Sequence, residues 1–316
     1  MNSETDVVII GSGPAAYTAA LFLNGVDTVL FEGDYNEEIG PGGQLTTTTA
    51  VDNYPGFPKG TTGPEMMLKM KDQARNKKVK IITEIITAIE SNNNEFLVIS
   101  KKQKISCKAV IIATGASAKK LVVPNSNKYW TKGISACAVC DGYFFMNKVC
   151  AVIGGGDTAL EESLYLANIC SKVIIIHRRD VFRARNDKVS IARNTKNVEI
   201  KTFFVLKECK GDESALKSIV VENTKTGKLE EIDVDGLFFA IGHQPNTKFL
   251  ADSNGSYIAD IEENQYLKTN DEMETTKPGI FACGDVQDYT YRQAVTAAAS
   301  GCVAAQSCLK FLKENN

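Results

Sequence analysis

Two cysteines separated by two residues, Cys137 and Cys140, are the side chains of this chain best suited to redox chemistry. Such a pair can close a small disulfide and reopen it, and one of its thiols often has a lowered pKa, which makes it a good nucleophile near neutral pH. The spacing alone also fits half of a zinc site, or two cysteines without a joint role. However, one glycine-rich nucleotide motif lies upstream, and another begins fourteen residues after Cys140. A dithiol between two nucleotide sites indicates an electron relay.

The upstream motif combines a strand, a glycine turn and a helix. The apolar, β-branched run 7–10 predicts a buried parallel strand, and residues 17–23 predict a helix. Between them, Gly11 permits a tight turn, Gly13 lets the backbone approach a pyrophosphate, and Ala16 allows the helix to pack closely on the strand. The N–H groups at the start of the helix favour an anion. The motif therefore predicts a dinucleotide site.

A carboxylate follows the next strand of this motif. Residues 28–31 predict a second strand, and Glu32 comes directly after it, 21 residues after Gly11. A carboxylate at that place can accept hydrogen bonds from the ribose hydroxyls of an adenosine. An isolated glutamate in a turn would more simply be a surface residue, but the surrounding strand–glycine–helix–strand unit favours ribose contact.

The second motif repeats this order but ends on basic residues. Strands are predicted at 149–153 and 173–176, with a glycine turn and the helix 158–167 between them. The side chains that then follow are His177, Arg178, Arg179 and Arg183. A carboxylate there would repel a 2′-phosphate, whereas arginines bind it bidentately. The second site is therefore expected to prefer NADP(H) over NAD(H), although a solvated charge cluster is the usual meaning of an arginine-rich stretch.

Composition excludes several classes of function. With 36 basic and 38 acidic residues the net charge is −2, which gives no global attraction to nucleic acid or to an anionic membrane. We find no apolar run of the roughly 18 residues that a membrane span needs, and no signal peptide. Nine cysteines with one motif-spaced pair indicate a reducing compartment, so we expect a cytoplasmic protein. No second Cys pair or His pair suits zinc, so no metal site is expected.

Further strands end on glycines, where ligands of open α/β sheets bind. The apolar run 109–112 leads to Gly115, the run 236–241 leads to Gly242, and the run 280–283 leads to Gly284 and Asp285. Asp285 could hold a polyol hydroxyl of a bound cofactor, or simply cap the next helix.

The order of these elements predicts an α/β protein with two nucleotide-binding, Rossmann-like, three-layer domains. The first domain is discontinuous, over residues 1–117 and 246–316, and the second is inserted as residues 118–245 and carries the CxxC. A basic stretch at 69–80 is interpreted as a solvated helix face, and 294–312 as a terminal helix rich in small residues. The threonine run 46–49 fits an edge strand as well as a loop.

These motifs together resemble the low-molecular-weight thioredoxin reductases, of the class-II pyridine nucleotide-disulphide oxidoreductases. The resemblance rests on stretches from end to end of the chain: residues 11–20, 42–49, 113–116, 137–142, 154–162, 177–179, 241–243, 284–286 and 291–295. It implies FAD on the first domain, NADPH and a disulfide on the second, thioredoxin as the substrate, and a homodimer. The charge and composition described above lead us to expect no binding to nucleic acid or membrane.

The resemblance also assigns residues to the two cofactors. Those expected at FAD are Gly11, Ser12, Gly13, Pro14, Ala15, Glu32, Gln44, Asn53, Gly115, Gly284, Asp285, Arg292, Gln293 and Ala294. Those expected at NADPH are Gly154, Gly156, Asp157, His177, Arg178, Arg179 and Arg183. The loop 34–41 is longer than in many bacterial members, which leaves local FAD contacts open, and Arg185 receives no role.

The family mechanism gives the redox residues distinct roles. By resemblance, Cys140 faces the flavin, Cys137 attacks thioredoxin and Asp141 is the acid–base group, with a rotation between the domains hinged near 117 and 245. The composition favours Asp141, because one of the two histidines, His177, belongs to the phosphate patch and the other, His243, follows a glycine turn. Asp141 could instead only form the turn before Gly142.

The nearest rival function belongs to the same class of flavoproteins, and a further rival is not an enzyme. The flavoprotein of a peroxide reductase system usually carries an extra N-terminal dithiol domain, and here a strand begins almost at Met1. Related reductases of ferredoxin lack the CxxC, and the large animal-type enzymes carry a C-terminal redox pair that we do not find. A non-enzymatic sensor that binds NADP would need no flavin.

Overall fold

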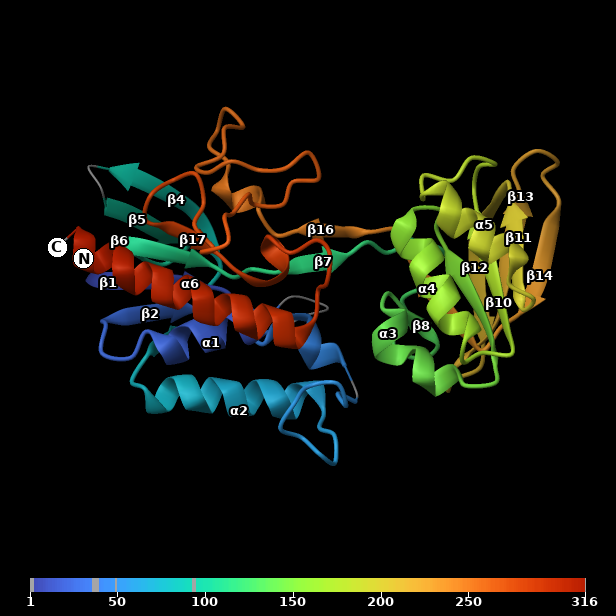
Figure 1. Ribbon diagram of the computed structural model, residues 1–316, viewed down its shortest axis with the longest axis horizontal. Coiled ribbons are helices and arrows are strands. Elements are labelled where there is room, and N and C mark those ends of the chain that lie inside the picture. The colour runs from blue at the N-terminus through green and yellow to red at the C-terminus, as the bar shows by residue number, and fades with distance from the viewer. Residues whose placement is uncertain (1–2, 36–39, 49, 93–94, 316) are drawn as a thin grey trace. The chain divides into compact units, whose positions relative to one another are not determined.

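The computed structural model describes residues 3–35, 40–48, 50–92 and 95–315. The chain divides into two compact units, one formed by Met1–Ser117 with Gln244–Asn316 and the other by Ala118–His243 (Figure 1). The sequence places the two crossings after residues 117 and 245, and the division of the structure falls after residues 117 and 243. Of the loop 34–41, residues 36–39 lie outside the described residues.

A sheet of mostly parallel strands forms the centre of the first unit. Along it, β3, β2, β1 and β6 are parallel neighbours; β6 then pairs with β17 near its carboxyl end and with the antiparallel β5 near its start, and β4 follows β5. The bounds are β1 (Ser3–Ile10), β2 (Thr28–Phe31), β3 (Lys80–Ile82), β4 (Ile86–Asn92), β5 (Glu95–Ser100), β6 (Lys104–Ile112) and β17 (Ile280–Ala282). Residues 7–10 are apolar without alternation because both faces of β1 are covered.

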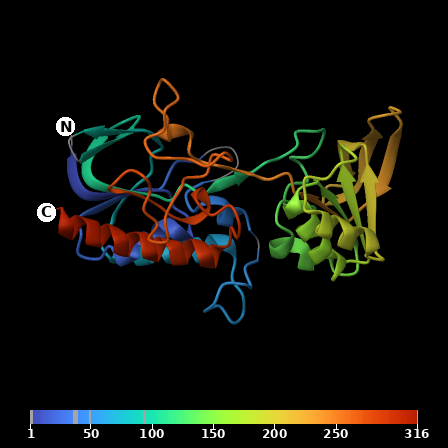
Figure 2. The same ribbon diagram turned by 45° about the horizontal axis from the view of Figure 1, so that its top comes forward.

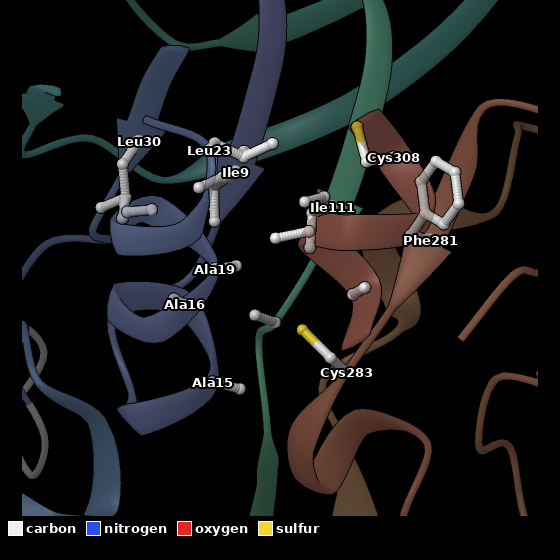
Figure 3. Close-up of a cluster of buried hydrophobic side chains, with 14 of the residues drawn as sticks. Ile9, Ala15, Ala16, Ala19, Leu23, Leu30, Ile111, Phe281, Cys283 and Cys308 are labelled. Carbon is white, nitrogen blue, oxygen red and sulfur yellow. The ribbon is translucent and has the colours of Figure 1, made fainter. Parts of the chain in front are cut away.

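Three helices cover one face of this sheet: α1 (Pro14–Phe22), α2 (Gly63–Asn76) and α6 (Ala294–Glu314) (Figure 1). Ile9, Leu30 and Ile111 from the strands and Leu23 next to α1 form the core beneath them (Figure 3). Small residues let α6 approach α1 closely, since a Cβ on Gly301 would lie 2.2 Å from the carbonyl oxygen of Ala15. On the opposite face, buried side chains of the sheet, including those of β4 and β5, form a second core with Leu250, Ala259 and Leu267.

The terminal helix corrects one expectation about the sequence. Over Ala294–Glu314, α6 is long and apolar enough to cross a membrane by length and composition, so the statement that no such run exists is wrong. Its Ala297, Ala304, Cys308 and Leu312 are buried in the core of the first unit, which accounts for its apolar character without a membrane.

The second unit has three layers. Its central sheet is parallel in the order β11, β10, β9, β15, β8, with helices packed on one face and an antiparallel sheet of β12, β13 and β14 on the other (Figure 2). The strand bounds are β8 (Ile134–Ser135), β9 (Val149–Ile153), β10 (Lys172–His177), β11 (Val198–Thr202), β12 (Phe204–Gly211), β13 (Leu216–Asn223), β14 (Leu229–Asp233) and β15 (Gly236–Phe239). The helices are α3 (Ala138–Asp141), α4 (Asp157–Ala167) and α5 (Asn186–Asn194). The predicted α/β class with two Rossmann-like domains is confirmed.

The two chain crossings form a small sheet of their own. Strand β7 (Ala116–Ala118) pairs with β16 (His243–Pro245). Backbone hydrogen bonds flank this pair, from Lys119 N–H to Gly242 O at 3.0 Å and from Asn246 N–H to Gly115 O at 3.0 Å. The inserted unit therefore leaves and re-enters the first unit through paired backbone.

Short 3₁₀ helices complete the fold: η1 (Gly43–Thr47), η2 (Gly142–Phe145), η3 (Lys248–Leu250) and η4 (Gly284–Val286). The threonine run therefore begins as a 3₁₀ helix rather than an edge strand, because Thr46 and Thr47 donate to backbone carbonyls three residues back. Strands β11 and β12 are separated by a single residue, Phe203, whose φ is +65°.

Candidate functional site

The Cys137–Cys140 pair forms a disulfide at the start of α3, with 5.3 Å between the two Cα atoms. Cys137 is the N-cap residue of this short helix, and the Cys140 N–H donates to Cys137 Sγ at 3.2 Å. Both cysteines are half-buried, so a partner can reach the bond from solvent. Because a backbone donor is directed at Cys137 Sγ, negative charge on that sulfur is stabilised once the bond opens.

Asp141 is linked to the dithiol through Ser135. The Ser135 hydroxyl donates to Asp141 Oδ2 at 2.5 Å, and the Cys137 N–H donates to Ser135 Oγ at 3.1 Å. Burial raises the pKa of the Asp141 carboxyl, and the Ser135 hydrogen bond opposes that rise in part. A carboxyl with a raised pKa beside two cysteines can take up and release a proton nearer to neutral pH.

Large apolar side chains within and just after the dithiol are exposed to solvent. They are Val139, between the two cysteines, and Tyr143, Phe144 and Met146 after them, and no motif in the sequence marks them. The backbone beneath them is held close to α4, because a Cβ on Gly142 would lie 3.0 Å from the Leu166 side chain. An exposed apolar group of this kind next to a reactive bond suits contact with another protein.

The first glycine turn has one crowded position and one open position. Gly11 has φ +128°, and a Cβ there would lie 2.1 Å from the carbonyl oxygen of Ala113 on the neighbouring strand. Gly13 has nothing within 4 Å of the place a Cβ would take. The turn is therefore pinned to the sheet on one side and leaves backbone accessible at the start of α1, which fits a pyrophosphate.

Glu32 is buried and held by three side chains. Lys71 Nζ lies 2.6 Å from its Oε2, Tyr17 donates to the same oxygen at 3.2 Å, and Thr83 donates to Oε1 at 2.7 Å. A carboxylate offers about four acceptor positions, so one remains for a ribose hydroxyl. Lys71 was expected on a solvated face, and that expectation is wrong because α2 packs this face toward Glu32.

Neighbouring loops are tied to this turn. Ser12 Oγ donates to the Glu32 carbonyl at 2.7 Å and accepts from the Gly42 N–H at 2.8 Å, so its side chain joins strand end and loop. Gln44 Nε2 donates to the Ala116 carbonyl, and Asn53 Nδ2 donates to Gln293 Oε1 at 3.3 Å. Residues far apart in the sequence therefore gather around the start of α1.

A second group lies at the start of α6. Gly284 has φ +72°, and a Cβ there would lie 2.9 Å from the Ala15 side chain, so the Gly284–Asp285 turn sits against the start of α1. Burial raises the pKa of Asp285 to about 7, the neighbouring Asp288 adds to the rise, and Arg292 opposes it. Pro14 and Ala294 are the first residues of α1 and α6. Gly115 has φ +66° with open space around it.

The second glycine turn has the same crowded and open positions. Gly154 has φ +156°, and a Cβ there would lie 2.4 Å from the Ala240 carbonyl oxygen, whereas Gly156 has open space. Gly155 supports His177, because a Cβ there would lie 2.2 Å from the imidazole Cε1. Asp157 begins α4; its Oδ1 accepts from the Arg185 N–H at 3.1 Å and lies 3.0 Å from Lys188 Nζ, and these bonds lower the Asp157 pKa.

The basic residues after β10 differ in their burial and in their ion pairs. His177 is buried, stacks on Phe182 with 4.7 Å between ring centroids, and its Nε2 lies 3.0 Å from the Val181 carbonyl oxygen. The arginines that remain exposed, with no acidic partner among the described residues, are Arg178, Arg179 and Arg183. Arg185 is paired with Asp187, its Nε 3.1 Å from Oδ1. Three arginines are thus available to an anion and a fourth is already neutralised.

The structure brings each set of predicted residues together within its own unit. One set surrounds the start of α1, another surrounds the start of α4, and the dithiol lies on α3. Within the described ranges, no group of three or more His, Cys, Asp or Glu residues could hold a metal ion. The sequence did not reveal Lys71, because nothing in the basic stretch 69–80 marks the lysine that pairs with Glu32.

Proteins similar to this chain in sequence and in structure belong to one family. The family model described as pyridine nucleotide-disulphide oxidoreductase matches residues 5–301. A protein of Debaryomyces hansenii named thioredoxin reductase is 45% identical over 98% of both chains, and thioredoxin reductase 1 of Saccharomyces cerevisiae is 44% identical over 97% of both chains. The solved structure of thioredoxin reductase from Giardia duodenalis superposes with a TM-score of 0.90 at 34% identity, over 99% of this chain and 100% of that one.

Proposed function

The chain belongs to the pyridine nucleotide-disulphide oxidoreductase family, and from that premise we propose that it is a thioredoxin-disulfide reductase that uses FAD and NADPH. The observation that carries the proposal is the half-exposed Cys137–Cys140 disulfide at the start of α3, in the unit that also contains the second glycine turn. In this proposal, electrons pass to a reversible disulfide from two nucleotide sites, one that contains a carboxylate and one that contains arginines.

The residues around each glycine turn fit a phosphate-bearing cofactor. In both turns a crowded glycine fixes the backbone and an open glycine leaves N–H groups accessible. FAD would bind to the first unit, where the buried Glu32 would accept from the adenosine ribose and Asp285 lies near the start of α1. NADPH would bind to the second unit, where the exposed Arg178, Arg179 and Arg183 would hold the 2′-phosphate. When bound, these cofactors supply hydride and two-electron transfer chemistry.

The dithiol residues have separate tasks in this proposal. The Cys137 thiolate attacks the disulfide of thioredoxin, so that a mixed disulfide forms and one thioredoxin sulfur leaves. The Cys140 thiolate then attacks Cys137 Sγ, which restores the Cys137–Cys140 bond and releases reduced thioredoxin. The Cys140 N–H stabilises charge on Cys137 Sγ, and Asp141, held by Ser135, takes up or delivers the proton.

The assembly and the partner surface extend the proposal. The exposed Val139, Tyr143, Phe144 and Met146 next to the disulfide suit the docking of thioredoxin. The homodimer follows from the family resemblance, and the cytoplasmic location follows from the single motif-spaced pair among nine cysteines. The rotation that lets the dithiol alternate between its electron donor and thioredoxin hinges at the paired strands β7 and β16, through which both crossings pass.

The test is an anaerobic titration of the purified protein with NADPH, followed by flavin absorbance. About two equivalents per chain are expected at full reduction, because the flavin and the disulfide each accept two electrons. An end point near one equivalent would leave the dithiol off the electron path and refute the proposal. If the protein binds no flavin after FAD is supplied, the result would favour the alternative function, a non-enzymatic sensor that binds NADP.

A further inference from the structure

Two other cysteines of the second unit lie side by side in its core. Cys150 is on β9, Cys170 is in the turn between α4 and β10, and their sulfur atoms are 3.6 Å apart. Both side chains are buried, Cys150 completely and Cys170 with 6% exposed. The mechanism of the Cys137–Cys140 pair makes no use of them.

We propose that Cys150 and Cys170 form a second redox-active pair, which a hydroperoxide oxidises to an intramolecular disulfide. A disulfide needs about 2.05 Å between its sulfurs, so the two side chains must close by about 1.5 Å from the observed 3.6 Å. The proposal concerns a modification of the fold and is independent of the thioredoxin reductase activity.

The packing around Cys150 leaves its sulfur little alternative to this partner. A Cβ on Gly236 would lie 3.0 Å from Cys150 Sγ and 2.9 Å from the Phe145 ring, so the space on the β15 side is filled. The Phe145 ring is itself fixed edge-to-face on Phe238, with 5.5 Å between centroids. Cys150 Sγ therefore cannot turn away from Cys170 without disturbing the core.

The backbone holds the two cysteines in register while leaving Cys170 near the surface. Asn147 N–H donates to the Ile169 carbonyl at 2.9 Å, and Ser171 N–H donates to the Lys148 carbonyl at 2.9 Å. These bonds tie the turn around Cys170 to the chain just before β9. Ser171 is exposed and Ile169 half-buried, so a small oxidant reaches Cys170 first.

Cys170 is the more exposed of the two cysteines and is therefore the attacking sulfur. The hydrogen bond between the two thiols lowers the pKa of Cys170, whereas this bond and burial raise the pKa of Cys150. The Cys170 thiolate attacks the hydroperoxide oxygen, which gives a sulfenic acid and releases hydroxide or an alkoxide. The Cys150 thiol then displaces the sulfenic oxygen as water, so that the two sulfurs together lose two electrons and the peroxide gains them.

The new bond would enclose a defined piece of the fold. The chain between Cys150 and Cys170 contains the second glycine turn and all of α4. The disulfide would close this strand, turn and helix into a covalent loop, and would stabilise them by reducing the conformational freedom of the unfolded chain. Oxidation therefore acts on the stability of the element assigned to the NADPH phosphates.

The sequence offers a direct chemical test. Tryptic cleavage after Lys148 and Lys172 releases one peptide, residues 149–172, that contains both cysteines and no other Lys or Arg. The protein is treated with hydrogen peroxide, unfolded, alkylated without reductant and digested. We expect this peptide without alkyl groups and lighter by two hydrogen atoms than the reduced form. A peptide that carries two alkyl groups, or added oxygen without loss of hydrogen, would overturn the proposal.

Thiol counts and a matched variant sharpen the result. Seven cysteines are free in the protein with its Cys137–Cys140 bond closed, and oxidation should leave five. Cys170→Ser should abolish the loss, whereas Cys209→Ser, which removes another buried cysteine of the same unit, should still lose two thiols. Oxidised wild type should melt roughly 5 °C higher than reduced protein. If Cys170→Ser does not fold, the wild-type peptide alone decides between the outcomes.

Discussion

The two glycine turns of this molecule share a backbone and differ in side chains. Gly11 lies against the Ala113 carbonyl and Gly154 against the Ala240 carbonyl, while Gly13 and Gly156 face open space. After the next strand, one unit buries Glu32 against a lysine, and the other buries His177 and exposes three arginines. In the proposed function, the shared backbone would hold the phosphates of either cofactor, and the residues after the second strand would select the nucleotide.

The largest effect is expected from filling the crowded position. Gly11→Ala places a Cβ 2.1 Å from the Ala113 carbonyl oxygen at a φ of +128°, so we expect a loss of at least about 3 kcal/mol in the free energy of unfolding. Denaturant unfolding measures it. Gly13→Ala is the matched control, which should fold normally yet bind FAD weakly. If Gly11→Ala were as stable as the wild type, Gly11 would not be the crowded position that distinguishes it from Gly13.

Lys71→Met tests the buried ion pair that is particular to the first unit. It leaves the Glu32 carboxylate buried with two neutral donors, and we expect the free energy of unfolding to fall by about 2–3 kcal/mol. Chemical unfolding of the flavin-free protein measures this loss. Lys69→Met, at an exposed pair on the same helix, should change stability by less than about 0.5 kcal/mol. A similar loss from both variants would contradict the role given to Lys71.

The arginines of the second unit should act on one cofactor only. Removal of both Arg178 and Arg179 by substitution with Ala should weaken NADPH binding by roughly 10–100-fold, because charge-assisted bonds to the 2′-phosphate are lost. Binding of NADH, which lacks that phosphate, should change little. Calorimetric titration with each nucleotide measures the ratio. Arg185→Ala is the control, since its guanidinium already pairs with Asp187; equal losses would mean that the exposed arginines have no special role.

The smallest effect is a pH dependence confined to the first unit. The Asp285 pKa is raised to about 7, so the folded state binds this proton more tightly than the unfolded chain. Its contribution to stability is therefore present at low pH and is lost as pH rises from about 4 to about 7. In flavin-free protein we expect a loss of roughly 1–2 kcal/mol, reduced by solvent access. Asp285→Asn should remove this slope in unfolding measurements; an unchanged slope would exclude Asp285 as its source.

Local patterns in the sequence predicted the parts of the site that depend on neighbours along the chain. A β-branched run, a glycine turn and a helix follow one another within a few residues, so β1, α1, β9 and α4 could be placed. The same holds for α6, whose small residues indicate close packing. The boundary between β11 and β12 could not be predicted, because it depends on one residue, Phe203, that adopts a left-handed backbone conformation and ends the strand pairing.

Contacts between distant residues could not be predicted. Lys71 and Glu32 meet only because α2 packs beside the end of β2, and nothing in a basic stretch distinguishes the lysine that turns inward. The arginines present the same problem, since pairing with Asp187 sets Arg185 apart from Arg178. Cys150 and Cys170 likewise meet through the β9–β10 pairing rather than through a spacing motif.

The pairing of β7 with β16 has a consequence for how such a chain can be built. The two ends of the Ala118–His243 unit are adjacent, so this unit is a long insertion between two neighbouring strands of the chain. The entropic cost of closing a loop rises only slowly with its length, so a long insertion costs little more than a short one. We therefore expect the first unit to fold when the whole insertion is replaced by a short turn, and the inserted unit to fold by itself. A fold of this kind would allow the inserted unit to be exchanged for another during evolution while the first unit keeps its own structure.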